Sequence, residues 1–252
     1  MSTASVSSRS DSLTLYGMGS PNVRKVVIML EELQLPYTLR HVAVFKGEQF
    51  TPEFLAMNPL GKVPVLVDPE LGRPLAESAA ILFWLAERYG ALLPEEGPAR
   101  FEVMQWVMVQ MASIGPMLGQ LNHFQIVSQA REPYAYGRYF AQAQRLYRFI
   151  DERLTANEWL AGDAYSIADI AAYPWMTYLE RHGFDPAQHR SLLRWRDALA
   201  ARAAVGRAGM RMDEAFTALS TQSRRSATAE DLDRFFGRVH AMPAADYSSV
   251  TR

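Results

Sequence analysis

The chain contains no cysteine in its 252 residues. That absence excludes structural disulfides, zinc–thiolate sites and a nucleophilic protein thiol, so any thiol chemistry must use a thiol that a ligand brings. No charge of one sign is in excess either, because 26 Lys and Arg residues are balanced by 27 Asp and Glu residues. The overall charge therefore gives no reason to expect a nucleic acid or an anionic membrane surface as a partner.

Long apolar runs are also absent. No stretch reaches the length that spans a membrane, and the first residues lack the apolar segment of a signal peptide. We therefore expect a cytoplasmic protein with no membrane partner. The opening letters, MSTASVSSRSDS, are polar and rich in serine, and we expect residues 1–11 to form a disordered leader.

The part of the chain that follows alternates strand and helix patterns. Residues 13–16 and 37–45 have the composition of strands. Between them, Ser20-Pro21-Asn22 opens a helix whose apolar residues recur at helical spacing, with proline in the first turn. Thr51 precedes a second, short helix. Two strands joined by a helix are typical of a parallel pair, and the order predicts a thioredoxin-like α/β domain over residues 12–92.

The rest of the chain has only helical patterns. Proline and glycine in residues 93–99 indicate a linker, and residues 100–212 are then expected to form an all-helical domain. Within it, Pro116 should kink or end a helix. The tail, residues 213–252, is polar, although residues 228–239 could form an amphipathic helix.

The most informative segment is GKVPVLVDPELGRPLAESAAI, residues 61–81. It predicts a hairpin followed by a helix that begins at Glu77-Ser78. Pro64 cannot donate to a sheet ladder, which leaves the backbone of Val63 available to another partner. A free strand edge beside a helix N-terminus, which binds carboxylates, predicts a place that holds a peptide.

This segment resembles the glutathione-binding half of the glutathione transferase superfamily, where a strand-edge residue, a cis-proline and a Glu-Ser pair hold the tripeptide. The resemblance assigns these roles to Val63, Pro64, Glu77 and Ser78. Residues 115–120, the helix from Pro133 and the stretch WLAGDAYSIADIAAYPW resemble the bacterial nu-class transferases. The implied fold is a thioredoxin-like α/β N-terminal domain followed by an all-α C-terminal domain.

Members of that class reduce disulfides and organic hydroperoxides with glutathione and need no cysteine of their own. The resemblance therefore implies glutathione as cosubstrate, no metal, and a small disulfide, peroxide or electrophile as the other partner. Ser20 and Asn22 would be catalytic, holding the glutathione thiolate at a helix N-terminus, where thiolates are favoured. The implied glutathione-binding residues are Gln49, Lys62, Val63, Glu77, Ser78 and, from the neighbouring subunit of a homodimer, Arg138.

Two other functions stay open at this point. A conjugating transferase would use the same thiolate to attack an electrophilic carbon. A non-catalytic regulator or binding protein could keep the fold without the chemistry, because a fold does not determine a function.

Several candidate residues have simpler interpretations. Tyr16 ends the first strand, where other transferase classes place a catalytic tyrosine, and we interpret it as packing or pocket wall. His123 is interpreted as pocket wall or as a polar residue with satisfied hydrogen bonds, because thiol attack on a disulfide needs no dedicated protein base. Ser166 and Asp169 form a variant of the capping box, so their predicted role is to stabilise a helix and not to catalyse a reaction.

Overall fold

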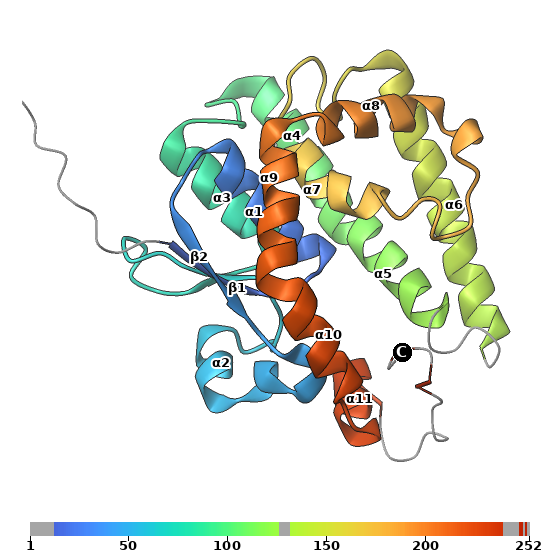
Figure 1. Ribbon diagram of the computed structural model, residues 1–252. Coiled ribbons are helices and arrows are strands. Elements are labelled where there is room, and N and C mark those ends of the chain that lie inside the picture. The colour runs from blue at the N-terminus through green and yellow to red at the C-terminus, as the bar shows by residue number, and fades with distance from the viewer. Residues whose placement is uncertain (1–12, 126–131, 239–246, 249, 251–252) are drawn as a thin grey trace, which may run out of the picture.

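The computed structural model describes residues 13–125, 132–238, 247, 248 and 250 (Figure 1). The predicted leader lies outside the described residues, as does the last residue of the helix predicted over 228–239.

A four-stranded sheet forms the N-terminal domain. The strand order is β2 (Tyr37–His41), β1 (Leu13–Gly17), β3 (Val65–Val67) and β4 (Leu75–Ala76). β1 and β2 are parallel, whereas β3 runs antiparallel to both of its neighbours. This mixed sheet is the thioredoxin-like arrangement that the order of elements predicts.

The second strand is shorter than predicted. The sequence pattern extends to residue 45, but β2 ends at His41 and the chain turns into a 3₁₀ helix, Val44–Lys46, which Gly47 ends with φ of 80°. Val42 and Val44 leave the strand to pack with Phe54, on a small core of their own. The apolar, β-branched residues after His41 are therefore compatible both with a strand and with a buried turn, and tertiary packing determines which of the two forms.

Three helices complete this domain: α1 (Pro21–Glu32), α2 (Pro52–Met57) and α3 (Ser78–Tyr89). Ser20 and Thr51 cap α1 and α2 as predicted, because their side chains accept hydrogen bonds from Val23 N at 3.4 Å and Phe54 N at 3.3 Å. Helix α1 is surrounded by α3 and by two helices of the second domain.

The second domain is helical, as predicted. Its main helices are α4 (Gly97–Val109), α5 (Gly115–His123), α6 (Pro133–Ala156), α7 (Ile167–Met176), α8 (Arg190–Ala200) and α9 (Ala203–Met212). A π-helical turn, Gln110–Ile114, joins α4 to α5. Pro116 lies in the first turn of α5, where a missing N–H costs little, so the helical path continues through the π turn instead of ending.

Helices continue into the polar tail that begins at residue 213. A second π turn, Asp213–Thr217, leads from α9 directly into α10 (Ala218–Arg225), so residue 213 lies within a continuous helical path. In Figure 1, α9 and α10 form one continuous path that bends between them, and α11 (Ala229–Phe236) lies beyond α10. The helix predicted from residue 228 is therefore confirmed as far as Phe236.

One apolar core runs through both domains, from one face of the sheet through α1 and α3 to the helices of the second domain. This continuity fixes the position of the two domains relative to each other. In the part of the chain that the structure describes, no helix combines the length and apolarity that crossing a membrane requires.

Candidate active site

A cavity of about 440 Å³ lies where the two domains meet. Residues of α1, of the loop before β3, of the start of α3 and of the α4–α5 π turn line it. It brings together five of the residues predicted for the site, namely Asn22, Lys62, Val63, Glu77 and Ser78. We call it the main cavity.

The loop before β3 forms one wall of the main cavity. The Val63–Pro64 peptide bond is cis, as the resemblance implied. β3 begins at Val65, so Val63 precedes the sheet ladder. Asn58, which the sequence analysis missed, also lines the cavity, and its Nδ2 donates to the carbonyl oxygen of Lys62 at 2.7 Å. That bond fixes the loop which presents Val63.

The N-terminus of α3 faces the same cavity. Glu77 precedes the helix with φ of 69°, a left-handed value that costs a non-glycine residue free energy and is often found at functional sites. Its side chain makes no capping hydrogen bond, although the first N–H groups of a helix lack partners within it. These N–H groups and the Ser78 hydroxyl are suited to a carboxylate.

Lys25 lies beneath this helix end and was missed by the sequence analysis. Its side chain is only 1% exposed. Nζ donates to Gln110 Oε1 at 2.6 Å and to Ser78 Oγ at 3.2 Å, so one ammonium group joins both domains. Burial lowers the pKa of Lys25 to about 7, while the nearby Glu77 carboxylate opposes that shift. In the sequence, Arg24-Lys25 is an ordinary basic pair, and only the helices around α1 show which one is buried.

Gln110 is the third residue that sequence reasoning missed. It lies in the π turn, is fully buried, and lines the main cavity. Its Oε1 accepts from Lys25, but within the described part of the chain its Nε2 has no hydrogen-bond partner. A Cβ at position 115 would lie 3.0 Å from that nitrogen, so the glycine at this position leaves room for the Gln110 amide. A buried donor without a partner at a cavity wall is expected to bind a ligand atom.

The two predicted catalytic residues lie in different surroundings. Trp175 Nε1 donates to Asn22 Oδ1 at 3.1 Å, and because an indole can only donate, the Asn22 NH₂ group points away from Trp175. Asn22 and Trp175 both line the main cavity. Ser20 instead lines a separate cavity of about 180 Å³, next to Arg24 and Tyr178. The structure thus brings Asn22, but not Ser20, to the wall of the main cavity.

The remaining predicted ligands lie outside the wall of the main cavity. Gln49 is buried, and among the described residues its Oε1 has no hydrogen-bond partner. Its backbone carbonyl lies close to Gly61, next to the cavity residue Lys62. Arg138 is exposed on α6. Tyr16 packs in the small core around Phe54.

Ser166 and Asp169 have the structural role that the sequence predicts. The capping box of α7 is complete, with Asp169 Oδ2 accepting from Ser166 N at 3.0 Å. Asp169 Oδ1 also accepts from Leu160 N at 2.9 Å and from Trp195 Nε1 at 2.8 Å. Neither residue lines the main cavity. Among the residues that the structure covers, no group of three or more His, Cys, Asp and Glu side chains could hold a metal ion.

Comparison with known proteins identifies the family. Residues 19–88 match the model for the glutathione S-transferase N-terminal domain, and residues 116–203 match that for the C-terminal domain. The disulfide-bond oxidoreductase YfcG of Escherichia coli is 41% identical over 201 residues, which cover 78% of this chain and 94% of YfcG. The chain therefore belongs to the glutathione S-transferase family and is an enzyme of that family.

Solved structures agree. A glutathione transferase from Pseudomonas fluorescens with two glutathione bound is 38% identical and has a TM-score of 0.73. The matched region covers 81% of this chain and 94% of the Pseudomonas fluorescens chain. A Pseudomonas putida glutathione transferase with one glutathione disulfide bound per subunit is 34% identical, has a TM-score of 0.74, and covers 81% and 93%. These similarities confirm the two-domain glutathione transferase fold.

Proposed function

We propose that the main cavity binds glutathione and that the enzyme uses it to reduce disulfides. The glutathione backbone pairs with Val63, and its γ-glutamyl carboxylate binds the N-terminus of α3 beside Ser78, with Glu77 and Lys62 completing the site. Lys25 lies beneath Ser78 and supplies positive charge to that carboxylate. The observation that carries the proposal is the convergence of Val63, Ser78 and Asn22 on one cavity in a chain that has no cysteine.

In the proposed reaction, the glutathione thiolate is the nucleophile. It attacks one sulfur of a disulfide, the old S–S bond breaks, and the other sulfur leaves as a thiolate. A second glutathione attacks the mixed disulfide so formed, which releases glutathione disulfide and the second substrate thiol. The protein supplies position and electrostatic stabilisation: Asn22 donates its NH₂ group to the thiolate, assisted by the N-terminus of α1. Ser20, which caps that terminus, contributes through the helix end.

Hydroperoxides are a second substrate class for the same thiolate. Attack on the peroxide oxygen yields a sulfenic acid of glutathione and an alcohol, and a second glutathione converts that acid to glutathione disulfide and water. Both reactions consume reduced glutathione, so we propose the reducing cytoplasm as the place of action.

We further propose that the enzyme is a homodimer in which Arg138 reaches the neighbouring subunit's site. Exposed Arg138 does not line the main cavity of its own chain. Phe101 and Met108 are 67% and 50% exposed on α4, which offers apolar surface to a second subunit. The Arg138 guanidinium would bind a carboxylate of the second glutathione in bidentate fashion.

The test compares three substrates at equal glutathione concentration: a small aliphatic disulfide, an alkyl hydroperoxide and an aryl halide. We expect turnover to be highest on the disulfide. A preference for the aryl halide would favour the conjugating transferase, and no turnover on any substrate, with glutathione binding retained, would favour a non-catalytic binding protein. The absence of glutathione binding by calorimetry would refute the proposal as a whole.

A further inference from the structure

The chain that follows β2 packs against α10 and α11. It forms two 3₁₀ helices, Val44–Lys46 and Glu48–Phe50, and we call residues 44–50 the 3₁₀ segment. Helices α10 and α11 both contact the first of these 3₁₀ helices (Figure 1). We call the described residues from 213 onward the C-terminal segment. The family model of the C-terminal domain ends at residue 203, so the C-terminal segment lies outside the part of the chain that matches the family.

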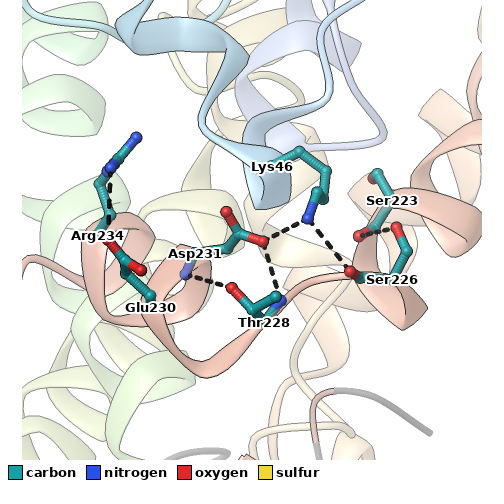
Figure 2. A network of polar contacts seen from close by, with 7 residues as sticks. All are labelled: Lys46, Ser223, Ser226, Thr228, Glu230, Asp231 and Arg234. Atoms are coloured by element: carbon teal, nitrogen blue, oxygen red, sulfur yellow. Dashed lines mark hydrogen bonds and ion pairs between the residues drawn. The ribbon is translucent and has the colours of Figure 1, made fainter.

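An ion pair joins the 3₁₀ segment to α11. Figure 2 shows Lys46 between Asp231 and the backbone of Ser226, with Nζ donating to the Ser226 carbonyl oxygen at 3.2 Å. Asp231 Oδ2 also accepts from Thr228 N at 2.9 Å and so completes the capping box of α11. The hydrogen bonds from Lys46 and Thr228 lower the pKa of Asp231 to about 2, so the pair stays charged at physiological pH. The first turn of α11 therefore holds the carboxylate in place for Lys46.

Further contacts lie on both sides of the ion pair. The rings of Phe45 and Phe235 have centroids 4.7 Å apart. Gly47 follows Lys46, and a Cβ at this glycine would lie 3.3 Å from Arg234 Nη1, so its backbone is close to the Arg234 side chain. Three consecutive residues of the 3₁₀ segment thus meet α11, which fixes both the position and the orientation of the segment.

The other end of the 3₁₀ segment lies against the loop that forms one wall of the main cavity. A Cβ at Gly61 would lie 2.9 Å from the Phe50 ring and 3.1 Å from the Gln49 carbonyl oxygen, so both groups are close to the Gly61 backbone. Gly61 has φ of 60°, and it directly precedes Lys62 and Val63, which line the main cavity. The 3₁₀ segment therefore supports, from outside the cavity, the loop that presents Val63.

We infer that Lys46 and Asp231 are positioning residues for glutathione. Through the 3₁₀ segment, their ion pair lets the C-terminal segment hold the loop that presents Val63. This inference rests on the proposed binding of glutathione in the main cavity. The ion pair orders the 3₁₀ segment before the ligand binds, so less conformational freedom is lost on binding. Neither residue lines the main cavity, so the effect is on binding and not on the chemical step.

Titration of the full-length protein with S-methylglutathione tests the binding step without turnover. Asp231→Asn keeps an oxygen that can cap α11 and removes the charge, and Lys46→Met removes the ammonium. Each should weaken binding by roughly threefold to fivefold, the size expected for a partly exposed ion pair. Lys46→Arg keeps the charge and the donors and should retain most of the wild-type affinity.

The matched control is Glu230→Gln. It removes the same charge one residue away on α11, where the side chain is exposed and lies 4.0 Å from its partner Arg234. This variant should bind S-methylglutathione with unchanged affinity. Equal weakening by Glu230→Gln and Asp231→Asn would mean a general effect of charge on α11 and would overturn the inference.

Steady-state kinetics separate positioning from a merely structural role. With a small aliphatic disulfide, Asp231→Asn should raise the KM for glutathione by the same factor as it weakens binding, with kcat at saturating glutathione unchanged. A variant that is only less stable would instead lower the amount of active enzyme, and therefore kcat, with an unchanged KM.

Unchanged affinity for S-methylglutathione in either Asp231→Asn or Lys46→Met would overturn the inference, as would a fall in kcat with an unchanged KM. If the wild-type protein does not bind S-methylglutathione, the proposed function fails together with the inference. If the wild type and all variants bind it equally well, only the inference fails.

Discussion

Two buried polar clusters in this enzyme look alike in composition and differ in how completely their hydrogen bonds are used. In one, Asp169 is fully buried and accepts hydrogen bonds from Ser166, Leu160 and Trp195. In the other, Lys25 is equally buried and donates to Ser78 and Gln110. The first cluster lines neither the main cavity nor the cavity beside Ser20, whereas the second forms the floor of the main cavity.

The difference lies in what is left unsatisfied. Each Asp169 oxygen already accepts a hydrogen bond, so the carboxylate has no unsatisfied oxygen for a ligand. The cluster therefore contributes to stability. Around Lys25, Gln110 Nε2 has no partner in the described chain and the N-terminus of α3 has no side-chain cap. Because an unpaired buried polar group costs free energy, such a cluster indicates a site whose ligand supplies the missing bonds.

The largest expected effect is on stability, from Asp169→Ala. It leaves the N–H groups of Leu160, Ser166 and Trp195 buried without an acceptor, at about 1–3 kcal/mol each. We expect a loss of roughly 3–5 kcal/mol and a melting temperature lower by on the order of 10 °C, with unchanged glutathione affinity per folded molecule. Thermal unfolding and calorimetry measure both.

The control is Asp163→Ala, which removes a carboxylate from an exposed position of the same loop. It should leave the melting temperature nearly unchanged. An Asp169→Ala protein with normal stability and no activity would reverse the assignment of that cluster to structure.

The next effect is on turnover, from Asn22→Ala. Removing a hydrogen bond to a charged sulfur costs about 1.5–3 kcal/mol, so disulfide reduction should slow by roughly tenfold or more with the fold intact. Ser20→Ala should reduce turnover less, because Ser20 does not line the main cavity, and it should lower stability by about 1 kcal/mol through the lost cap. Steady-state kinetics and unfolding of both variants test this order. A larger fall in turnover for Ser20→Ala would place the sulfur beside Ser20.

A further expected effect is that Lys25 makes the stability of the fold depend on pH. In the folded protein its pKa is about 7, against 10.5 for an ordinary lysine, so the unfolded chain binds more protons between these values. Its contribution to the free energy of unfolding therefore rises with pH from about 7 to 10.5. The groups that face the ammonium are Glu77, which precedes α3, Ser78 at the start of α3, and Gln110 and Met111 on the π turn. Only Glu77 among them is charged.

Lys25→Met should remove this slope, which denaturant unfolding at pH 7 and pH 9.5 would measure. The ligand adds a second readout. A carboxylate bound beside Ser78 raises the pKa of Lys25, so S-methylglutathione, which has no thiol, should bind at pH 8 with uptake of protons. Titrations in two buffers of different ionisation enthalpy detect the uptake. Its persistence in Lys25→Met would assign the proton to another group.

The smallest expected effect is that of Arg138→Ala, because the pairing is exposed and screened by salt. The substitution should weaken the binding of glutathione disulfide more than the binding of a single glutathione, and the difference should be about 1 kcal/mol or less. Mixing Arg138→Ala with Asn22→Ala subunits tests whether the arginine acts across an interface. If it does, each mixed dimer has one site free of both defects, and that site should bind glutathione disulfide with unchanged affinity.

Local signals predicted much of the fold. Ser20 and Thr51 caps, the Ser166 capping box and the start of α3 each depend on residues a few positions apart, which a single sequence displays. The Gly61–Ile81 motif is equally local, whereas its cis-proline, which the structure contains, was implied by the resemblance to the family. Where a segment was compatible with two conformations, as after His41, the predicted strand was too long because distant packing partners decide the outcome.

Two of the missed residues have one property in common. Lys25 and Gln110 are 85 positions apart, and neither belongs to a motif. Their meaning depends on a π turn that brings the helical domain against α1, and on a glycine at position 115 that leaves room for the amide. Such a site forms only from contacts between domains. The sequence therefore shows each of these residues but not that they lie next to one another.

The most direct test of the account is a crystal structure with glutathione disulfide bound. We expect one γ-glutamyl carboxylate at the N-terminus of α3 beside Ser78, the adjoining peptide backbone paired with Val63, and the sulfur within hydrogen-bond distance of Asn22 Nδ2. Glutathione disulfide bound outside the main cavity, or bound there with its sulfur out of reach of Asn22, would contradict the central claim.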